Sequence, residues 1–216
     1  LWLNEGFANM MAFIAVDHLF PDWRIWEQYV VTDTNAALRR DALSNVQSVR
    51  VRVSHPDEIG TLFDPSIVYA KGGSLLRMLW ASLDETVFRK GLQNYFKKHA
   101  YGNTSAGDLW KELDEVSGRD IGGLMKKWLN HPGYPVVEIK HIPGSNEATL
   151  TQHRFVIGPV SDDASMQMHW DVPLAGSTAL APDTLSTKKA MVKLVKNDST
   201  AHPLILNHES ASYFVA

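Results

Sequence analysis

The first residues of the chain place a single carboxylate in an apolar segment. Glu5 lies within the opening stretch LWLNEGFANMMAF, with Gly6 and Ala8 as small neighbours. A carboxylate inside a buried helix is costly unless it is paired with a cation or bound to a metal ion. Carboxylates are also common in the first turn of a helix, where they face the positive end of the helix dipole. With Asn4 as the helix cap, Glu5 is therefore either a metal ligand or an ordinary first-turn acid.

A second stretch combines a tyrosine with a pair of glycines. Asp64-Pro65-Ser66 is typical of a helix start, and Tyr69 follows it within an apolar stripe. The stripe is expected to face the core and contains Ile67, Val68, Leu75, Leu76 and Leu79. The pair Gly72-Gly73 should weaken a helix by about 2 kcal/mol relative to alanine, a cost that the close approach of another backbone or of a ligand would explain. From the residues alone, Tyr69 is interpreted as a core tyrosine whose hydroxyl bonds to the backbone.

Most other catalytic signatures are absent from the sequence. It contains no HExxH, no phosphate-binding glycine loop and no nucleophile elbow. None of the nine histidines has another histidine four positions away, and there is no cysteine to form a disulfide or a thiolate site. The net charge of -3 gives no reason to expect nucleic acid or an anionic membrane as a partner. The longest apolar run, Met10–Val16, is too short to span a bilayer.

The elements that would position Glu5 and Tyr69 divide the chain into two parts. Apolar residues at three- and four-residue steps predict helices over Phe88–His99 and Ser105–Val116, the second with a capping-box variant formed by Ser105 and Asp108. The segment HPGYP at 131–135 cannot continue a helix. The strands expected after it are Val136–His141, Ala148–Ile157, Met166–Leu174, Lys189–Lys196 and Tyr213–Val215. We predict an α+β fold with a helical domain at 1–131 and a small antiparallel β-sandwich at 132–216.

Taken together, the segments LWLNEGFA and HPDEIGTLFDPSIVYAKGGSLLRML resemble the aminopeptidase N family of zinc metallopeptidases. In that family an HExxH helix precedes a WLNEGFA segment whose glutamate is the third zinc ligand, and a tyrosine follows in a Y-x-KG segment. Later in the chain, KKWLNHPGYPVVEI resembles the end of the family's peptidase domain. The stretches TQHRFVIG, WDVPL and LILNHESASYFVA resemble strands of the sandwich that follows it. The resemblance covers nearly the whole chain.

This resemblance implies a fold, a reaction and a site. The fold is the helical C-terminal part of a thermolysin-like peptidase domain followed by a β-sandwich. Enzymes of the family remove single residues from the free N-terminus of peptides by attack of a zinc-activated water, so peptide substrates and one zinc ion per full-length chain are expected. Glu5 matches the third zinc ligand, and Tyr69 matches the tyrosine that donates to the developing oxyanion.

Other polar residues have less specific interpretations. We interpret Asn4 and Asp64 as helix caps that could also orient metal ligands. His55, before a proline, is interpreted as structural. Lys71 is expected at the surface or in side-chain packing, and Arg77 is expected to pair with an acid.

The family's HExxH helix would lie before Leu1, and its helical C-terminal domain after Ala216. We therefore expect an internal fragment that is inactive alone, retains no zinc and self-associates through apolar surface around Trp2–Ile14. The absence of cysteine favours a cytoplasmic parent enzyme. Two alternatives stay open, namely a non-catalytic scaffold or interaction module with the same fold, and a family member of another specificity such as an epoxide hydrolase relative.

Overall fold

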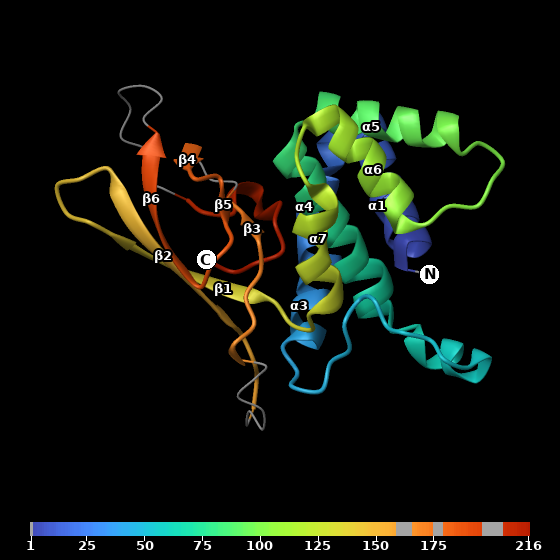
Figure 1. The fold of residues 1–216 in the computed structure, drawn as a ribbon, viewed down its shortest axis with the longest axis horizontal. Coiled ribbons are helices and arrows are strands. Elements are labelled where there is room, and N and C mark those ends of the chain that lie inside the picture. Colours follow the sequence, from blue (N-terminus) through green and yellow to red (C-terminus); the bar gives the residue numbers. More distant parts are fainter. Residues whose placement is uncertain (1, 159–165, 175–178, 196–204) are drawn as a thin grey trace.

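Residues 2–158, 166–174, 179–195 and 205–216 are described by a computed structural model of the chain. Figure 1 shows the helices on one side of the molecule and the strands on the other, with the N-terminus on the helical side. The helical segments are α1 (Trp2–Leu19), η1 (Pro21–Trp23), α2 (Ile25–Tyr29), η2 (Val30–Thr34), α3 (Asn35–Asp41), η3 (Pro56–Leu62), η4 (Ser66–Lys71), α4 (Gly72–Leu83), α5 (Glu85–Lys98), α6 (Ala106–Ser117), α7 (Ile121–Asn130) and η5 (His208–Ser210). Of these, η2 and η4 are π-helical.

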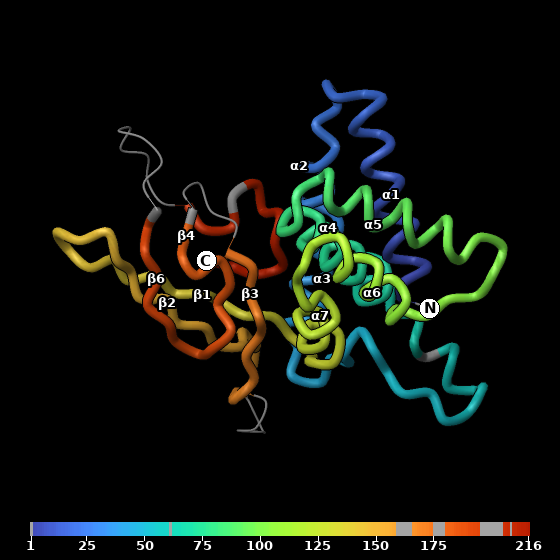
Figure 2. Tube along the Cα trace, turned by 45° about the horizontal axis from the view of Figure 1, so that its top comes forward, coloured from blue at the N-terminus to red at the C-terminus, as the bar shows by residue number. Residues whose placement is uncertain are grey.

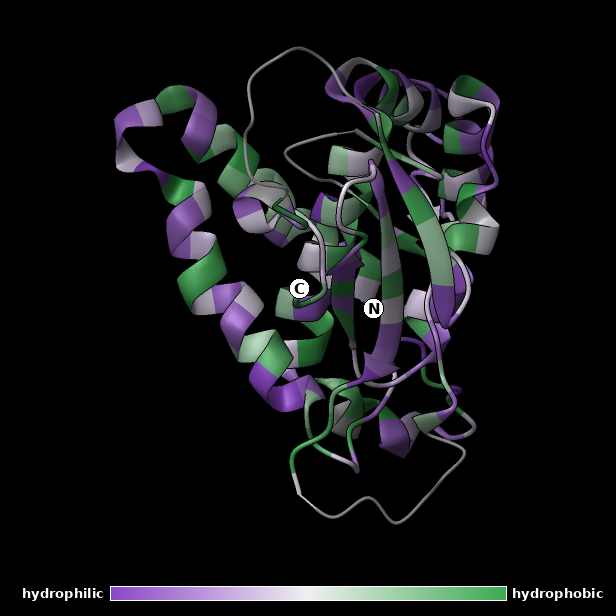
Figure 3. Cartoon of the chain, turned by 90° about the vertical axis from the view of Figure 1, so that its left-hand side faces the viewer, coloured by the Kyte–Doolittle hydropathy of each residue, from purple (hydrophilic) through white to green (hydrophobic). Residues whose placement is uncertain are grey.

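Within the described residues, the strands form two antiparallel sheets. One has the strand order β1-β2-β6-β4, and the other pairs β3 with β5. The strands are β1 (Pro135–His141), β2 (Glu147–Arg154), β3 (Val172–Pro173), β4 (Ala179–Ala181), β5 (Thr184–Leu185) and β6 (Lys189–Val195). Buried and half-buried residues alternate along β2, as expected for a strand with one face on the core. Figure 3 shows this interleaving of hydrophobic and hydrophilic residues along the sheet.

The predicted helices are present, and their first turns are capped by side chains. α5 and α6 match the two predicted helices to within three residues at each end. The Asp108 carboxylate accepts hydrogen bonds from the Ser105 backbone N (2.7 Å) and hydroxyl (2.8 Å), and these bonds lower the pKa of Asp108. Asp120 caps α7 by accepting from the backbone N of Gly123 at 2.7 Å. Local sequence thus sets where these helices begin.

The helix α1 is covered on one narrow face. Its buried residues are Trp2, Gly6 and Met10, which recur at four-residue steps. Figure 2 shows α1 and α2 projecting together from the rest of the helices. Near the turn between them, Leu19 is 66% exposed and Trp23 is 57% exposed.

The core continues from the helices into the β part. The Trp128 ring on α7 lies 6.0 Å from the Trp170 ring and 6.4 Å from the Tyr213 ring, centroid to centroid. Its indole N donates to the carbonyl of Asp171 at 2.8 Å, and Lys127 Nζ lies 2.9 Å from an Asp171 carboxylate oxygen. The helical and β parts are therefore joined by both apolar and polar contacts.

The chain passes from α7 to β1 through a turn that requires glycine. Gly133 has φ +87°, and a Cβ at this position would lie 2.4 Å from Arg154 Nε. Residues other than glycine rarely adopt that backbone conformation, and at this position there is also no room for a side chain. The turn therefore brings the backbone of residue 133 against β2.

The α+β class and the antiparallel pairing are confirmed, but the strand predictions are wrong in part. Tyr213–Val215 is irregular, and Val215 forms only an isolated bridge with Val136. Of the predicted Met166–Leu174 strand, only β3 forms, whereas β4 and β5 were not predicted. Lys196, at the end of another predicted strand, lies outside the described residues.

A side chain explains why so little of the Met166–Leu174 segment is a strand. The Gln152 amide on β2 accepts from the Trp170 backbone N (2.9 Å) and donates to the carbonyls of Trp170 (2.8 Å) and Thr187 (2.9 Å). These bonds satisfy backbone groups that would otherwise require a partner on a neighbouring strand.

Across the part of the chain that the structure describes, no helix combines the length and apolarity that a membrane crossing requires.

Candidate functional site

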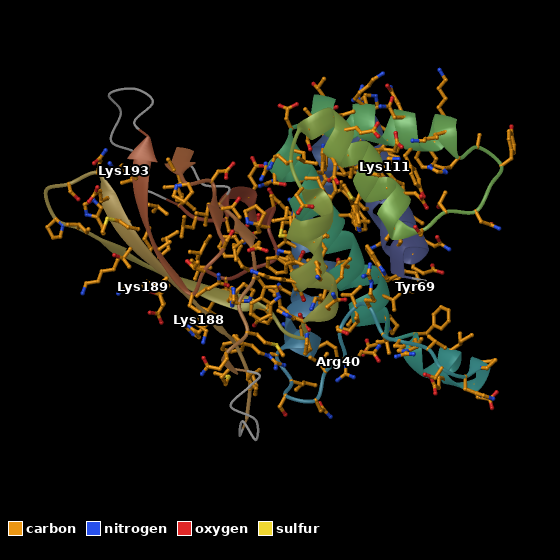
Figure 4. The ribbon with its side chains drawn as sticks, viewed as in Figure 1. Arg40, Tyr69, Lys111, Lys188, Lys189 and Lys193 are labelled. Carbon is orange, nitrogen blue, oxygen red and sulfur yellow. The ribbon has the colours of Figure 1, made fainter. Side chains whose placement is uncertain are left out.

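Glu5 and Tyr69 lie on neighbouring elements of the helical part. Glu5 is in the first turn of α1 and is half-buried, and Tyr69 lies on the π-helix η4. Tyr69 is 36% exposed, so it is not the core tyrosine that was considered from the sequence. Figure 4 labels Tyr69 near the N-terminal end of α1 and far from the lysines of the sheet.

The two side chains interact. The pKa of Tyr69 is raised above its ordinary value because its hydroxyl can hydrogen-bond to the Glu5 carboxylate, whose negative charge adds to the effect. A phenol beside a carboxylate stays protonated and remains a hydrogen-bond donor. The site therefore presents one carboxylate and one neutral donor side by side at an accessible surface.

Close contact between backbones holds Glu5 and Tyr69 together. A Cβ on Gly6 would lie 2.8 Å from the carbonyl carbon of Gly72 and 2.9 Å from the backbone N of Gly73. A Cβ on Gly73 would lie 2.7 Å from the Tyr29 hydroxyl. Gly72 and Gly73 therefore allow another backbone to approach closely, which explains why two glycines are tolerated in this helix. The backbone that approaches is that of Gly6, the residue directly after Glu5.

Replacing Gly6 with alanine is expected to destabilise the chain by about 1–3 kcal/mol, because the added methyl meets backbone atoms that cannot move aside cheaply. Urea unfolding measures the loss. Gly60→Ala is the matched control, since a Cβ on Gly60 has no heavy atom within 4 Å, and it should change the free energy of unfolding little. Equal stability of the two variants would contradict this expectation and would show that α1 and α4 can move apart at little cost.

The segment that carries Tyr69 is also fixed at its start. The Asp64 carboxylate accepts from the Ser66 backbone N at 3.0 Å and lies 2.5 Å from Arg40 Nε. Asp64 is therefore the predicted cap. Asn4 is not a cap, because it lies inside α1 and is exposed. His55 Nδ1 accepts from the Asp57 backbone N at 3.3 Å at the start of η3, in agreement with a structural role.

Two cations, Lys71 and Arg77, follow Tyr69 in the sequence. Lys71 is fully buried, and its Nζ lies 2.6 Å from an Asp41 carboxylate oxygen, so a surface position is wrong and a role in side-chain packing is confirmed. Arg77 donates to the carbonyls of Ser210 (2.9 Å) and Glu209 (3.2 Å). Both bonds go to backbone carbonyls of the C-terminal segment, and the expected pairing of Arg77 with an acid stays a prediction. The sequence signal for the burial of Lys71 was its position among the residues of the apolar stripe.

The fit of this site to a metal ion is partial. No group of three or more His, Asp or Glu side chains within the described residues is placed to hold a metal ion. Glu5 offers one accessible carboxylate on a rigidly packed helix, which suits one ligand of a zinc site. Any further ligands would have to come from outside the described residues.

Comparisons with known proteins show which family the chain is similar to. The model of the peptidase family M1 domain matches residues 1–128. Aminopeptidase N of Lactococcus lactis subsp. lactis (strain IL1403) is 44% identical over 220 residues, and aminopeptidase N of Lactobacillus helveticus is 40% identical over 217 residues. The alanine/arginine aminopeptidase of Saccharomyces cerevisiae (strain ATCC 204508 / S288c) is 38% identical over 216 residues.

These matches cover 99–100% of this chain but 22–25% of each relative, so the chain spans about a quarter of their length. They confirm the resemblance to the aminopeptidase N family that the motifs around Glu5 and Tyr69 indicated. On the family match and on the identity to these relatives, the chain belongs to peptidase family M1.

Proposed function

We propose that this chain is part of a zinc-dependent aminopeptidase that hydrolyses the N-terminal residue from peptides. The observation that carries the proposal is the close backbone contact of Gly6 with Gly72 and Gly73, which places Glu5 on α1 beside η4, the helix that carries the exposed Tyr69. Family membership and the names of the relatives support the same reaction. The other specificities considered from the sequence remain alternatives.

In the proposed reaction Glu5 binds zinc and Tyr69 binds the oxyanion. A bound zinc ion would lower the pKa of its water and polarise the scissile carbonyl. The Glu5 carboxylate would be one of three protein ligands, the others lying outside the described residues. The Tyr69 hydroxyl would donate a hydrogen bond to the oxygen that gains charge in the transition state. This hydroxyl is protonated at neutral pH, because the ordinary pKa of tyrosine is about 10 and the surroundings of Tyr69 raise it further.

The proposal includes the organisation of the chain. Residues 1–131 would form the C-terminal helical part of a thermolysin-like catalytic domain, and residues 132–216 a β-sandwich domain. Exposed apolar residues on and after α1, such as Met11 and Leu19, agree with self-association of the isolated chain, which remains a prediction. The absence of cysteine favours a cytoplasmic location.

The proposal predicts different behaviour for the longer protein and for the isolated chain. The longer protein should cleave peptides with a free N-terminus, spare N-acetylated peptides and lose activity to a zinc chelator. The isolated chain should retain no stoichiometric zinc after dialysis, because one carboxylate cannot hold zinc against water. Metal analysis and a peptide-cleavage assay measure both properties.

A longer protein that binds no zinc and cleaves no peptide would instead support the non-catalytic module. One zinc per isolated chain, lost on Glu5→Ala, would show that a complete ligand set exists within these residues.

A further inference from the structure

Lys71 is a buried cation with a well-defined set of partners. Its side chain has no exposed surface, and its Nζ lies 2.6 Å from an Asp41 carboxylate oxygen. It also donates to the Gly133 carbonyl at 3.1 Å and lies 5.6 Å from the centroid of the Tyr213 ring. Burial lowers the pKa of Lys71, and the Asp41 carboxylate opposes that shift. A buried ammonium is tolerated only where such partners compensate for lost water.

Asp41 connects this cation to the β part of the molecule. One carboxylate oxygen accepts from the Gly133 backbone N at 2.8 Å, and the other accepts from the Tyr213 hydroxyl at 3.3 Å. Gly133 is the turn between α7 and β1, and Tyr213 is packed in the shared core. The pair therefore joins α3, η4, the turn and the C-terminal segment at one buried point.

The same π-helical turn presents Lys71 and Tyr69 in different directions. Residues two apart on a helix do not share a face. Tyr69 is accordingly 36% exposed next to Glu5, whereas Lys71 is fully buried. Between them, the Ala70 carbonyl accepts from the Tyr29 hydroxyl at 3.4 Å. Isolated π-helical turns are frequent at functional sites, where tertiary contacts must maintain them.

We propose that Lys71 is a positioning residue for Tyr69, because its ion pair with Asp41 holds the π-helical turn that presents the Tyr69 hydroxyl beside Glu5. The proposal rests on the proposed role of Tyr69 in peptide hydrolysis. It also gives the β part a function, since Gly133 and Tyr213 complete the buried network. Lys71 itself contacts no substrate in this arrangement.

Lys71→Met in the longer protein tests this proposal. The variant keeps side-chain length and removes the charge, and kcat should fall by about 10–100-fold with little change in KM, as expected for a small displacement of a catalytic group. Lys127→Met is the matched control. Lys127 also pairs with an acid across the helical and β parts, at Asp171, but this pair includes no residue of η4, so the kcat of the control variant should stay close to that of the parent.

A double-variant cycle separates positioning from general stability. If Lys71 acts through the Tyr69 hydroxyl, Lys71→Met should cause no further loss of kcat in a Tyr69→Phe background. Tyr213→Phe removes one hydroxyl from the network and provides a milder variant that should fold, with kcat lower by about 2- to 10-fold. This loss, too, should vanish in the Tyr69→Phe background.

The proposal is overturned if Lys71→Met or Tyr213→Phe retains the parent kcat, or if either lowers kcat equally with and without the Tyr69 hydroxyl. An inactive parent would instead reject the proposed function, so the two failures are distinguishable.

Discussion

Replacing Tyr69 with phenylalanine in the longer protein is expected to lower kcat by a factor on the order of 10²–10³. KM should change little, because the hydroxyl would donate to charge that develops only in the transition state. Zinc content and melting temperature should also stay the same. Tyr69 is 36% exposed, so loss of its hydroxyl leaves no deeply buried group without a partner. Kinetics with a chromogenic aminoacyl substrate, measured beside a melting curve, test both expectations.

Tyr101→Phe provides the control for this substitution. Tyr101 is fully exposed after α5, so its hydroxyl should contribute neither to kcat nor to stability. The oxyanion role is wrong if Tyr69→Phe keeps more than about half of the parent kcat, since a single oxyanion donor contributes far more than this.

Replacing Glu5 with glutamine is expected to remove zinc from the longer protein. Glutamine keeps the size of the side chain, but its neutral amide is a much poorer zinc ligand than a carboxylate. The loss of affinity should exceed the roughly 10–100-fold that the loss of an outer partner of a metal ligand costs. Zinc per protein after dialysis measures the effect, and activity should fall in parallel.

Glu85→Gln is the matched control, because Glu85 is also a first-turn acid but lies on α5 in an exposed pair with Arg89. This variant should retain its zinc. If Glu5→Gln also retains one zinc per chain, Glu5 is not a zinc ligand. It is then an ordinary first-turn acid that interacts with the dipole of α1, the alternative considered from the sequence.

Much of the helical part could be predicted from local signals. The capping pair Ser105 and Asp108 and the helix start at Asp64 depend on residues a few positions apart, and both are present in the structure. The burial of the core-facing stripe could also be predicted, because the spacing of apolar residues indicates which side of a helix is buried. The glycine pair at residues 72 and 73 predicted a close approach, although not that Gly6 would be the partner.

What could not be predicted depends on contacts between distant residues. Nothing near Lys71 in the sequence indicates that Asp41 neutralises it, so a surface lysine was an equal expectation. The short strands β4 and β5 also escaped prediction, because they have too few residues to show a period. The Gln152 amide hydrogen-bonds to the carbonyls of Trp170 and Thr187, which in a regular sheet would bond to a neighbouring strand. A sequence pattern does not show that a side chain takes the place of a strand.

The buried network around Lys71 has a consequence for biosynthesis. Tyr213 lies 172 residues after the Asp41 carboxylate that it contacts, and the carbonyl of Ser210 lies 133 residues after Arg77. A ribosome needs roughly 10–30 s for the longer span, at about 5–20 residues per second. During that time the helices can form from local contacts and Lys71 can pair with Asp41, while Asp41 still lacks the Tyr213 hydroxyl and Arg77 still lacks the Ser210 carbonyl. The buried network is therefore completed only after residue 213 has been translated, and a stalled nascent chain would hold the Lys71–Asp41 pair in an incomplete core.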